Sequence, residues 1–232
     1  MDKILQLQSV VNKLLDGKTN IKALEAGCGS YRFIQFDKNA YVIGIDISEK
    51  QLQLNSYLSE KILGDIQYYD FQNPIFDVII CWNVLEHLPK PELALENFAK
   101  AIKDDSIIVL ALPNVLSLKG IVTKFTPHWF HILFYRYIWG IKNAGKNDTA
   151  PFKCYLKFSL RIQAIKRFAI NNSLRIVYFD NYDVMDIDHI RGRSKILYVT
   201  YKPLMIFLKT ISFGKLGCSD FFVILQKTQK AR

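Results

Sequence analysis

The sequence is short of the residues that mark several common protein classes. Its four Cys, at 28, 81, 154 and 218, form no CxxC pair and no Cys/His cluster, which excludes zinc ribbons and redox dithiols. Seven Pro and eleven Gly are too few for collagen-like or linker-rich chains. No apolar run reaches the ~20 residues that span a bilayer, and the first residues do not resemble a signal peptide. We therefore expect a reducing, cytoplasmic location.

Acidic residues are also scarce in one part of the chain. Residues 119–167 contain ten Lys or Arg and a single acid, Asp148, whereas the remaining chain carries 21 basic and 20 acidic residues. The net charge of +10 is therefore concentrated in one segment, which we expect to meet an anionic partner. Half of the 232 residues are hydrophobic, enough for the core of a single domain.

Strand-like and helix-like stretches alternate along the chain. Short apolar runs predict strands at 21–26, 41–45, 61–63, 76–80, 106–112, 174–182 and 220–226. Helical spacing or capping predicts helices at 4–15, after Ser48, at 91–102, at 158–170 and at 195–213, the last interrupted by Pro203. This order predicts an α/β fold with a mostly parallel sheet covered by helices on both faces. Ligands of such sheets bind beyond the carboxyl ends of the strands.

A glycine bend follows the first predicted strand. Gly27 and Gly29 allow a ligand to approach the backbone closely. A GxGxxG dinucleotide loop would need a third Gly at position 32, which is Arg32, and the lysine of a P-loop is absent. Glu25 would repel a phosphate and would suit an ammonium group. The bend therefore disfavours a pyrophosphate ligand.

Two further acids follow predicted strands. Asp46 ends the second strand and can accept both hydrogen bonds of a ribose diol, while Asp65 follows the third strand beside the apolar Ile66 and can accept from an exocyclic amine. Together with the bend, these residues predict a ligand that has an amino-acid head, a ribose and an adenine but no phosphate.

Three segments resemble motifs of the class I S-adenosylmethionine-dependent methyltransferases. Leu24–Gly29 (LEAGCG) is similar to their first motif, Val42–Ser48 (VIGIDIS) to their acidic second strand, and Phe76–Leu88 (FDVIICWNVLEHL) to the fourth-strand motif of the small-molecule branch. Order and spacing agree over roughly residues 20–113. The resemblance implies a Rossmann-like, mostly parallel seven-stranded sheet with S-adenosyl-L-methionine as cofactor.

The same resemblance implies roles for individual residues. Gly27, Cys28 and Gly29 would pass beneath the methionine part of the cofactor, with Glu25 nearby, and Asp46 would hold the ribose hydroxyls.

The remaining assignments concern the adenine and the methyl group. Ile47 would pack on the adenine, Asp65 and Ile66 would complete its pocket, and Cys81 and Asn83 would line the methionine side. Some relatives bind a divalent metal through a Glu-x-x-Glu-His pattern, but Asn83 replaces the first Glu here, so we predict no metal.

Two histidines are candidate catalytic residues. His87 follows the fourth predicted strand and His128 lies in the segment after the fifth, where this family places substrate-facing insertions. A histidine near neutrality suits a general base for a hydroxyl nucleophile. A role of His87 in shaping the cofactor loop, and a surface position for His128, remain open alternatives.

The chain divides into a cofactor-binding core at 18–113 and two insertions at 114–157 and 183–213, within one methyltransferase domain spanning 1–232. Seven aromatic residues lie between Phe125 and Trp139 among Lys and Arg, and the second insertion is similarly apolar. Such a composition is typical of a segment at a membrane interface, of a lid packed on the domain, of a homodimer interface, or of a nucleic-acid surface. The absence of a recognised RNA-binding module disfavours nucleic acid.

We therefore expect O-methylation of a small or lipid-linked acceptor, such as a sugar, glycolipid or quinone-like hydroxyl, by an enzyme that rests on the inner face of the membrane. A non-catalytic binding or scaffold protein on the same fold, or an RNA methyltransferase, is the alternative.

Overall fold

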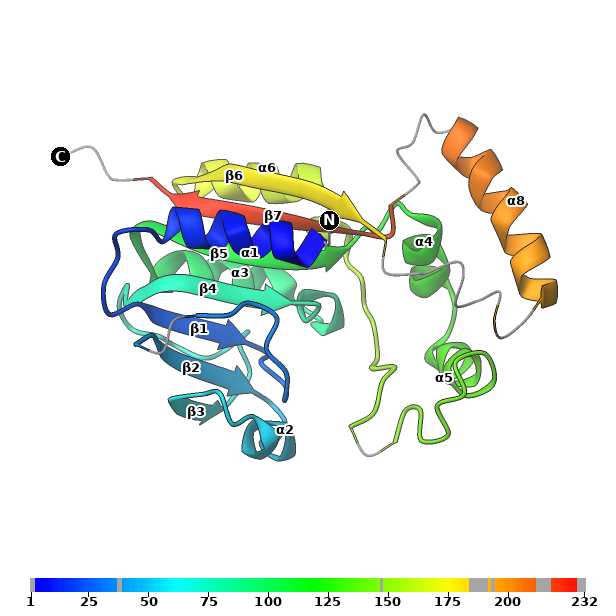
Figure 1. Ribbon diagram of the computed structural model, residues 1–232, viewed down its shortest axis with the longest axis horizontal. Helices are drawn as coiled ribbons and strands as arrows, with labels where there is room; N and C mark the ends of the chain where they lie inside the picture. Colours follow the sequence, from blue (N-terminus) through cyan, green and yellow to red (C-terminus); the bar gives the residue numbers. More distant parts are fainter. Residues whose placement is uncertain are drawn as a thin grey trace.

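The computed structural model describes residues 3–36, 39–146, 148–183, 192, 195–211 and 218–228. It contains a twisted seven-stranded sheet between layers of helices (Figure 1). Across the sheet, the strands run in the order β3 (Glu60–Leu63), β2 (Tyr41–Asp46), β1 (Lys22–Ala26), β4 (Phe76–Trp82), β5 (Ile102–Pro113), β7 (Asp220–Lys227) and β6 (Leu174–Tyr182). The predicted α/β, mostly parallel sheet is confirmed, with β7 antiparallel to both of its neighbours.

The central strands are buried on both faces. Along β5, Ile108 and Leu110 point into one core while Ile107 and Val109 point into the other, as the alternation of side chains along a strand requires. This two-sided burial explains why β4 and β5 read as continuous apolar runs.

Helices cover each face with an apolar stripe. Leu7 and Val11 of α1 (Lys3–Leu14) pack on one face. The other face is covered by α3 (Pro91–Ala101) and α6 (Ile162–Asn171), the latter preceded by the short helix η2 (Phe158–Leu160). The helix α2 (Glu49–Leu54) begins at the N-cap Ser48, whose side chain accepts a hydrogen bond from Gln51 N.

Three helices lie beyond the carboxyl ends of the parallel strands. Figure 1 shows α4 (Leu118–Phe125), α5 (His128–Tyr137) and α8 (Lys195–Ile211) grouped on this side of the molecule. The first two belong to the insertion predicted at 114–157 and the third to the one at 183–213, of which residues 184–191, 193–194 and 212–213 lie outside the described residues. No described helix is both long and apolar enough to cross a membrane.

Two details differ from the sequence expectation. Pro203 lies inside α8 rather than interrupting it, because a proline removes one hydrogen-bond donor and does not always end a helix. The strand β5 begins at Ile102, four residues before the predicted start, because Ile102 already pairs with Phe76 of β4.

The turn after β1 brings the backbone close to the segment after β4. Gly27 and Gly29 have φ of +69° and +49°, a region that favours glycine. Gly27 N donates to Ile45 O at 2.8 Å, and a Cβ on Gly27 would lie 2.5 Å from Val84, whereas one on Gly29 would meet nothing within 4 Å. The space at Gly27 is therefore filled by a neighbouring side chain.

These surroundings predict different effects of two alanine substitutions. Gly29→Ala carries only the cost of the positive φ, about 1 kcal/mol, while Gly27→Ala adds an overlap with Val84 of about 1–3 kcal/mol. Urea unfolding curves should therefore show a larger loss of stability for Gly27→Ala. Equal losses in the two variants would show that the turn is not seated against Val84.

Candidate active site

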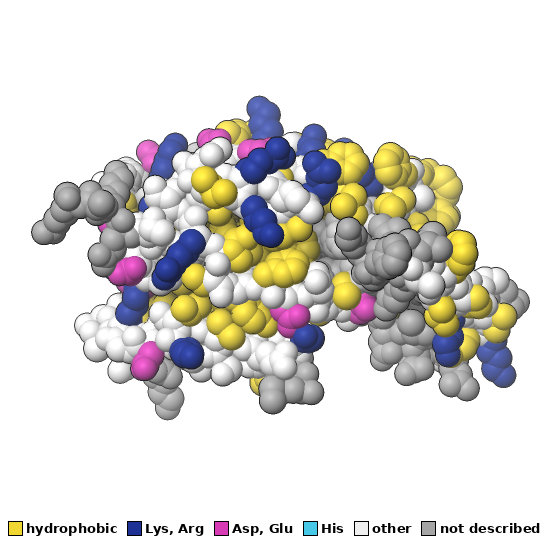
Figure 2. Space-filling view, turned by 90° about the horizontal axis from the view of Figure 1, so that it is seen from above, with side chains coloured by type: hydrophobic (Ala, Val, Ile, Leu, Met, Phe, Trp, Pro, Cys, Tyr) yellow, Lys and Arg dark blue, Asp and Glu magenta, His cyan; other side chains and the backbone are white. Residues whose placement is uncertain are grey.

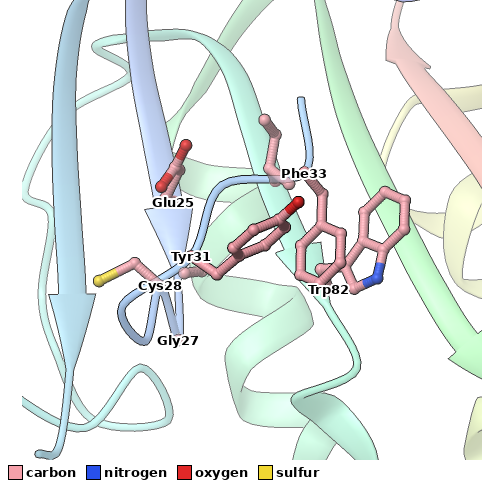
Figure 3. A pocket seen from close by; sticks show the side chains of 8 residues that line it. Glu25, Gly27, Cys28, Tyr31, Phe33 and Trp82 are labelled. Atoms are coloured by element: carbon pink, nitrogen blue, oxygen red, sulfur yellow. The ribbon is translucent and has the colours of Figure 1, made fainter. Parts of the chain in front are cut away.

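A cleft opens where β1 and β4 end. It is lined by Glu25, Ala26, Gly27, Cys28, Tyr31, Phe33, Ile80 and Trp82. Figure 3 shows the carboxylate of Glu25 on one side of the turn and the rings of Tyr31, Phe33 and Trp82 on the other. The cleft thus has one acidic side and one aromatic side, at the edge of the sheet where ligands of such folds bind.

Glu25 is buried with only one of its carboxylate oxygens satisfied. Arg32 Nε donates to Glu25 Oε1 at 3.0 Å and Arg32 also donates to Tyr57 O at 2.6 Å. Glu25 Oε2 is buried without a hydrogen-bond partner among the described residues. Burial raises the pKa of Glu25, and the adjacent Arg32 lowers it in part. A half-satisfied buried carboxylate favours a ligand that brings a cationic donor.

Asp46 ties the turn to the second strand. Its two oxygens accept from Gly29 N and Ser48 N, each at 2.9 Å. The parallel register pairs Ala26 with Ile45, so the ends of β1 and β2 lie side by side. Each carboxylate oxygen has a second acceptor site, and Asp46 is partly exposed. Asp46 can therefore hold the turn and accept from a ligand's diol at the same time.

The three residues predicted to form the adenine pocket, Ile47, Asp65 and Ile66, differ in their exposure to solvent. Ile47 is 76% exposed and offers an open apolar surface next to Asp46. Asp65 accepts from Gln67 N at 2.9 Å and remains partly exposed. The side chain of Ile66, by contrast, is 4% exposed and packs in the core. The structure therefore does not bring the side chain of Ile66 to the open surface formed beside Ile47.

The two cysteines near the cleft, Cys28 and Cys81, are protonated thiols at neutral pH. Burial, followed by the charge of Asp46, raises the pKa of Cys28 to about 12. Cys81 is fully buried in β4, and burial raises its pKa as well. Asn83, with φ of +52°, has a buried side-chain oxygen without a partner. Cys81 thus reaches the cleft only through its backbone, while Asn83 presents a free acceptor.

The aromatic side of the cleft was not anticipated from the sequence. Phe33 stacks on Trp82 with ring centroids 4.4 Å apart, and Tyr31 packs edge-on against Phe33 at 4.9 Å. Arg32 was noted only as a departure from GxGxxG, whereas it is the partner of Glu25. The sequence signal was present in the run Tyr31–Phe33, which directly follows the glycine bend.

The structure brings the two predicted catalytic histidines near each other. His87 Nδ1 lies 2.9 Å from Lys153 O, which places the proton on Nδ1 and leaves Nε2 as an acceptor. Burial is the largest influence that lowers the pKa of His87, and His128 lowers it further. His128 Nδ1 is buried without a hydrogen-bond partner in the part of the chain that the structure describes. A neutral His87 with a free nitrogen can accept a proton.

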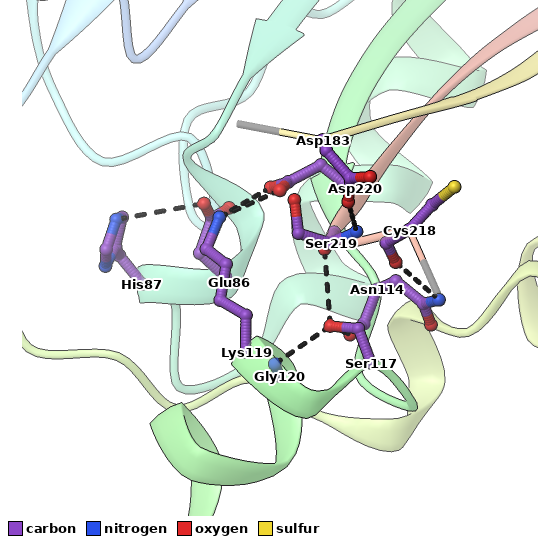
Figure 4. Close-up of polar contacts among 10 residues, drawn as sticks. All are labelled: Glu86, His87, Asn114, Ser117, Lys119, Gly120, Asp183, Cys218, Ser219 and Asp220. Atoms are coloured by element: carbon purple, nitrogen blue, oxygen red, sulfur yellow. Dashed lines mark hydrogen bonds and ion pairs between the residues drawn. The ribbon is translucent and has the colours of Figure 1, made fainter. Parts of the chain in front are cut away.

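A second group of polar residues, absent from the sequence predictions, lies beside His87 (Figure 4). Lys119 Nζ, from α4, contacts both oxygens of Asp220 at 2.9 Å. Glu86, in the short helix η1 (Leu85–His87), is buried with Oε2 unpartnered and Oε1 3.9 Å from His87 Nε2. Burial is the main cause that raises the pKa of Glu86 to about 8. We call Glu86, Lys119, Asp220 and Tyr182 the buried polar cluster.

Within the described ranges, no group of three or more His, Cys, Asp or Glu side chains has a geometry that could hold a metal ion. The residues that converge on the carboxyl edge are instead hydrogen-bond acceptors and aromatic rings.

Comparisons with known proteins agree with this geometry. A family model described as "Methyltransferase domain" matches residues 2–141, more than half of the chain. An uncharacterized protein of Methanocaldococcus jannaschii is 29% identical over 110 residues, which cover 47% of this chain and 48% of that protein. The chain thus spans about half the length of this relative.

Two further matches cover more of the chain. A ubiquinone biosynthesis O-methyltransferase of Azoarcus sp. is 25% identical over 195 residues, 80% of this chain and 77% of the relative. The solved structure of the plantazolicin methyltransferase BpumL in complex with SAH has a TM-score of 0.58 at 13% identity, over 97% of this chain and 83% of that one. The strand order and the site are consistent with these matches. The chain belongs to the methyltransferase domain family, the class I enzymes whose cofactor is S-adenosylmethionine.

Proposed function

We propose that this protein transfers the methyl group of S-adenosylmethionine to a hydroxyl oxygen of an apolar or lipid-linked acceptor. The observation that carries this proposal is the shared location of two features. The acidic cleft and the apolar helices α4 and α5 both lie at the carboxyl edge of the sheet. The O-methyltransferase activity of the ubiquinone relatives supports oxygen as the accepting atom.

The cofactor roles follow from the contacts around the turn. The free oxygen of Glu25 suits the ammonium group of the methionine part, with Gly27, Cys28 and Gly29 beneath it. Asp46 accepts the ribose hydroxyls through its remaining acceptor sites, and the exposed side chain of Ile47 packs on the adenine. The backbone of Asp65 and Ile66 borders the adenine edge, while Cys81 and Asn83 border the methyl group.

The rate of the reaction depends mainly on how the acceptor oxygen is aligned with the methyl carbon. A sulfonium is already an activated leaving group, so holding the acceptor oxygen in line with the methyl carbon supplies much of the rate. A base then removes the hydroxyl proton. His87 and His128 are the bases proposed from the sequence, and the free Nε2 of His87 supports the first.

The ribose role predicts that Asp46→Ala removes cofactor binding. Hydrogen bonds to a charged group contribute about 1.5–3 kcal/mol each, so the Kd of S-adenosylhomocysteine measured by calorimetry should rise at least about 100-fold. Glu49→Ala, which removes an exposed carboxylate three residues away, should leave the Kd unchanged. Unchanged binding to Asp46→Ala would refute the assignment.

The acceptor proposal predicts that label from methyl-tritiated S-adenosylmethionine reaches an alkylated catechol. The same catechol with both hydroxyls already methylated should remain unlabelled. A longer alkyl chain should raise kcat/KM, because each buried CH₂ contributes about 0.8 kcal/mol.

The other acceptors distinguish the alternatives. Label in an alkylated aniline instead of the catechol would indicate methylation at nitrogen, and label in purified RNA would indicate an RNA methyltransferase. No labelled product from these acceptors or from cell extract would favour the non-catalytic alternative.

The outer surface of the insertions supports contact with an anionic membrane. The helices α4, α5 and α8 contain six Lys or Arg and no acid. Their exposed side chains include Phe125, Trp129, Tyr137 and Phe207, and Figure 2 shows hydrophobic and basic side chains together at this end of the molecule. Apolar side chains that enter the headgroup region, with cations beside them, are what interfacial binding requires.

Membrane contact predicts sedimentation with vesicles that contain phosphatidylglycerol, and less sedimentation as NaCl is added. Phe125→Ser should weaken the partition coefficient about tenfold or more, because burial of an aromatic side chain contributes about 1.5–3 kcal/mol. Ile170→Ser on α6, an equally exposed apolar position, is the matched control. Equal recovery of the wild type in the supernatant with and without vesicles would contradict membrane contact.

A further inference from the structure

The polar atoms that lack a partner are concentrated around one end of the sheet. Among the described buried side chains without a hydrogen bond, Asn83 Oδ1, Glu86 Oε2, His128 Nδ1 and Tyr182 Oη belong to segments at the carboxyl edge. Buried polar groups are normally satisfied, and each unsatisfied one costs about 1–3 kcal/mol. A group of them at the edge where the methyl donor binds indicates that a polar ligand supplies the missing partners.

Glu86 and His128 are the members of this group that can take a proton, and of the two only Glu86 is a buried residue, 6% exposed. Its carboxyl lies directly after β4, on η1, so it faces the same edge as the cofactor cleft. The nearby cation, Lys119, already binds both oxygens of Asp220, so no described Lys or Arg pairs with Glu86, and its one charged contact is with His87 Nε2 at 3.9 Å when that histidine is protonated. One oxygen of Glu86 therefore remains available to a hydroxyl group.

The buried polar cluster also explains how Glu86 is held. The backbone oxygen of Glu86 accepts from Tyr155 N at 2.8 Å and from Leu156 N at 3.0 Å. Asp220 and Tyr182 are paired across β7 and β6, and both lie close enough to Glu86 to interact with it electrostatically. The backbone of Glu86 is thus held by the segment at Tyr155 and Leu156, and its carboxyl lies within electrostatic reach of groups on β6 and β7.

We propose that Glu86, in place of the two histidines considered above, is the general base of the methyl transfer and that it binds the acceptor hydroxyl together with Tyr182. The acceptor's O–H bond breaks and its proton passes to the Glu86 carboxylate. The oxygen forms a bond to the methyl carbon, and the electron pair of the broken C–S bond stays on sulfur, leaving neutral S-adenosylhomocysteine. The ion pair of Lys119 with Asp220 lies beside this carboxyl, and His87 Nε2 lies 3.9 Å from its other oxygen. This assignment rests on the proposed hydroxyl methylation.

The protonation state of Glu86 gives the proposal a pH signature. The titratable groups that face it, taken by element, are His87 on η1, Lys119 on α4, Cys81 on β4, Asp220 on β7, Tyr182 on β6, and Cys154. Burial keeps Glu86 protonated until about pH 8, so the base is formed as the pH rises through that value. The kcat of the wild type should therefore increase up to about pH 8 and then level off.

The decisive experiment compares two acceptors in the variant Glu86→Gln. An alkylcatechol must lose its proton during the reaction, whereas 4-nitrocatechol is already ionised near neutral pH and needs no base. We expect kcat for the alkylcatechol to fall at least about 100-fold and to lose its rise toward pH 8, while kcat for 4-nitrocatechol falls less than about fivefold. The Kd of S-adenosylhomocysteine should stay within twofold.

The matched control is Glu92→Gln, which removes an exposed carboxylate on α3 and should leave every parameter unchanged. An equal loss for both acceptors in Glu86→Gln would show that Glu86 only maintains the structure. No loss for either acceptor would show that another group takes the proton. Both outcomes overturn the proposal.

A measurement on the protein without acceptor checks the buried carboxyl itself. Between about pH 5 and pH 8 the folded state holds a proton on Glu86 that the unfolded chain has released, so the stability of the wild type falls as pH rises. The Tm of Glu86→Gln relative to the wild type should therefore increase across this range, by roughly 3–6 °C per pH unit at most. A constant difference would overturn the proposal.

A binding experiment tests the assignment of Glu86 separately from the proposed methylation of hydroxyl groups. If the wild type methylates none of the hydroxyl acceptors, 4-nitrocatechol can still be bound to the complex with S-adenosylhomocysteine and titrated by its absorbance. Glu86 is still neutral at the pH where the dye ionises, and its carboxyl O–H is a stronger donor to the ionised dye than a Gln amide is, so the bound dye should ionise at a higher pH in Glu86→Gln than in the wild type. An unshifted titration, or no binding of the dye, would overturn the assignment of Glu86.

Discussion

The hydrogen bond from Gly29 N to Asp46 is the contact on which the cofactor cleft depends. It fastens the turn after β1 to the end of β2, and the turn in turn fits against Val84 after β4. Three strand ends that are distant in the sequence are thereby held in one arrangement. Because the same carboxylate also faces solvent, the group that shapes the cleft is available to its ligand, and binding requires little rearrangement of the backbone.

The site contains two buried carboxyl groups, Glu25 and Glu86, which suit different ligands. Glu25 keeps one oxygen on Arg32 and one oxygen free, which suits a permanent cation. Glu86 has no Lys or Arg partner among the described residues and a raised pKa, which suits a proton that is gained and lost. Burial disfavours the charged form of both groups; Arg32 offsets this effect at Glu25, whereas Asp220 adds to it at Glu86. Such unsatisfied polar groups reduce stability and are typical of functional sites.

Local sequence patterns were enough to predict most of the strands and the residues that follow β1, β2 and β4. The strands at β1, β2 and β4 are short apolar runs that end in Gly or Asp, and each of these signals lies within a few residues. The pairing of Lys119 with Asp220 joins residues 101 positions apart, and Tyr182 reaches Glu86 only through the pairing of β6 with β7. No periodicity or spacing encodes such contacts, so the acceptor side was limited to the histidines, and the burial of Ile66 was missed.

The ion pair between Lys119 and Asp220 also connects the first insertion to the last strand of the sheet. Lys119 lies in the first turn of α4, which follows β5, and Asp220 is the first residue of β7. A displacement of α4 is therefore transmitted to a carboxylate that interacts with Glu86. A ligand that moves α4 outward and a ligand that fills the acceptor site would change each other's affinity by the same factor.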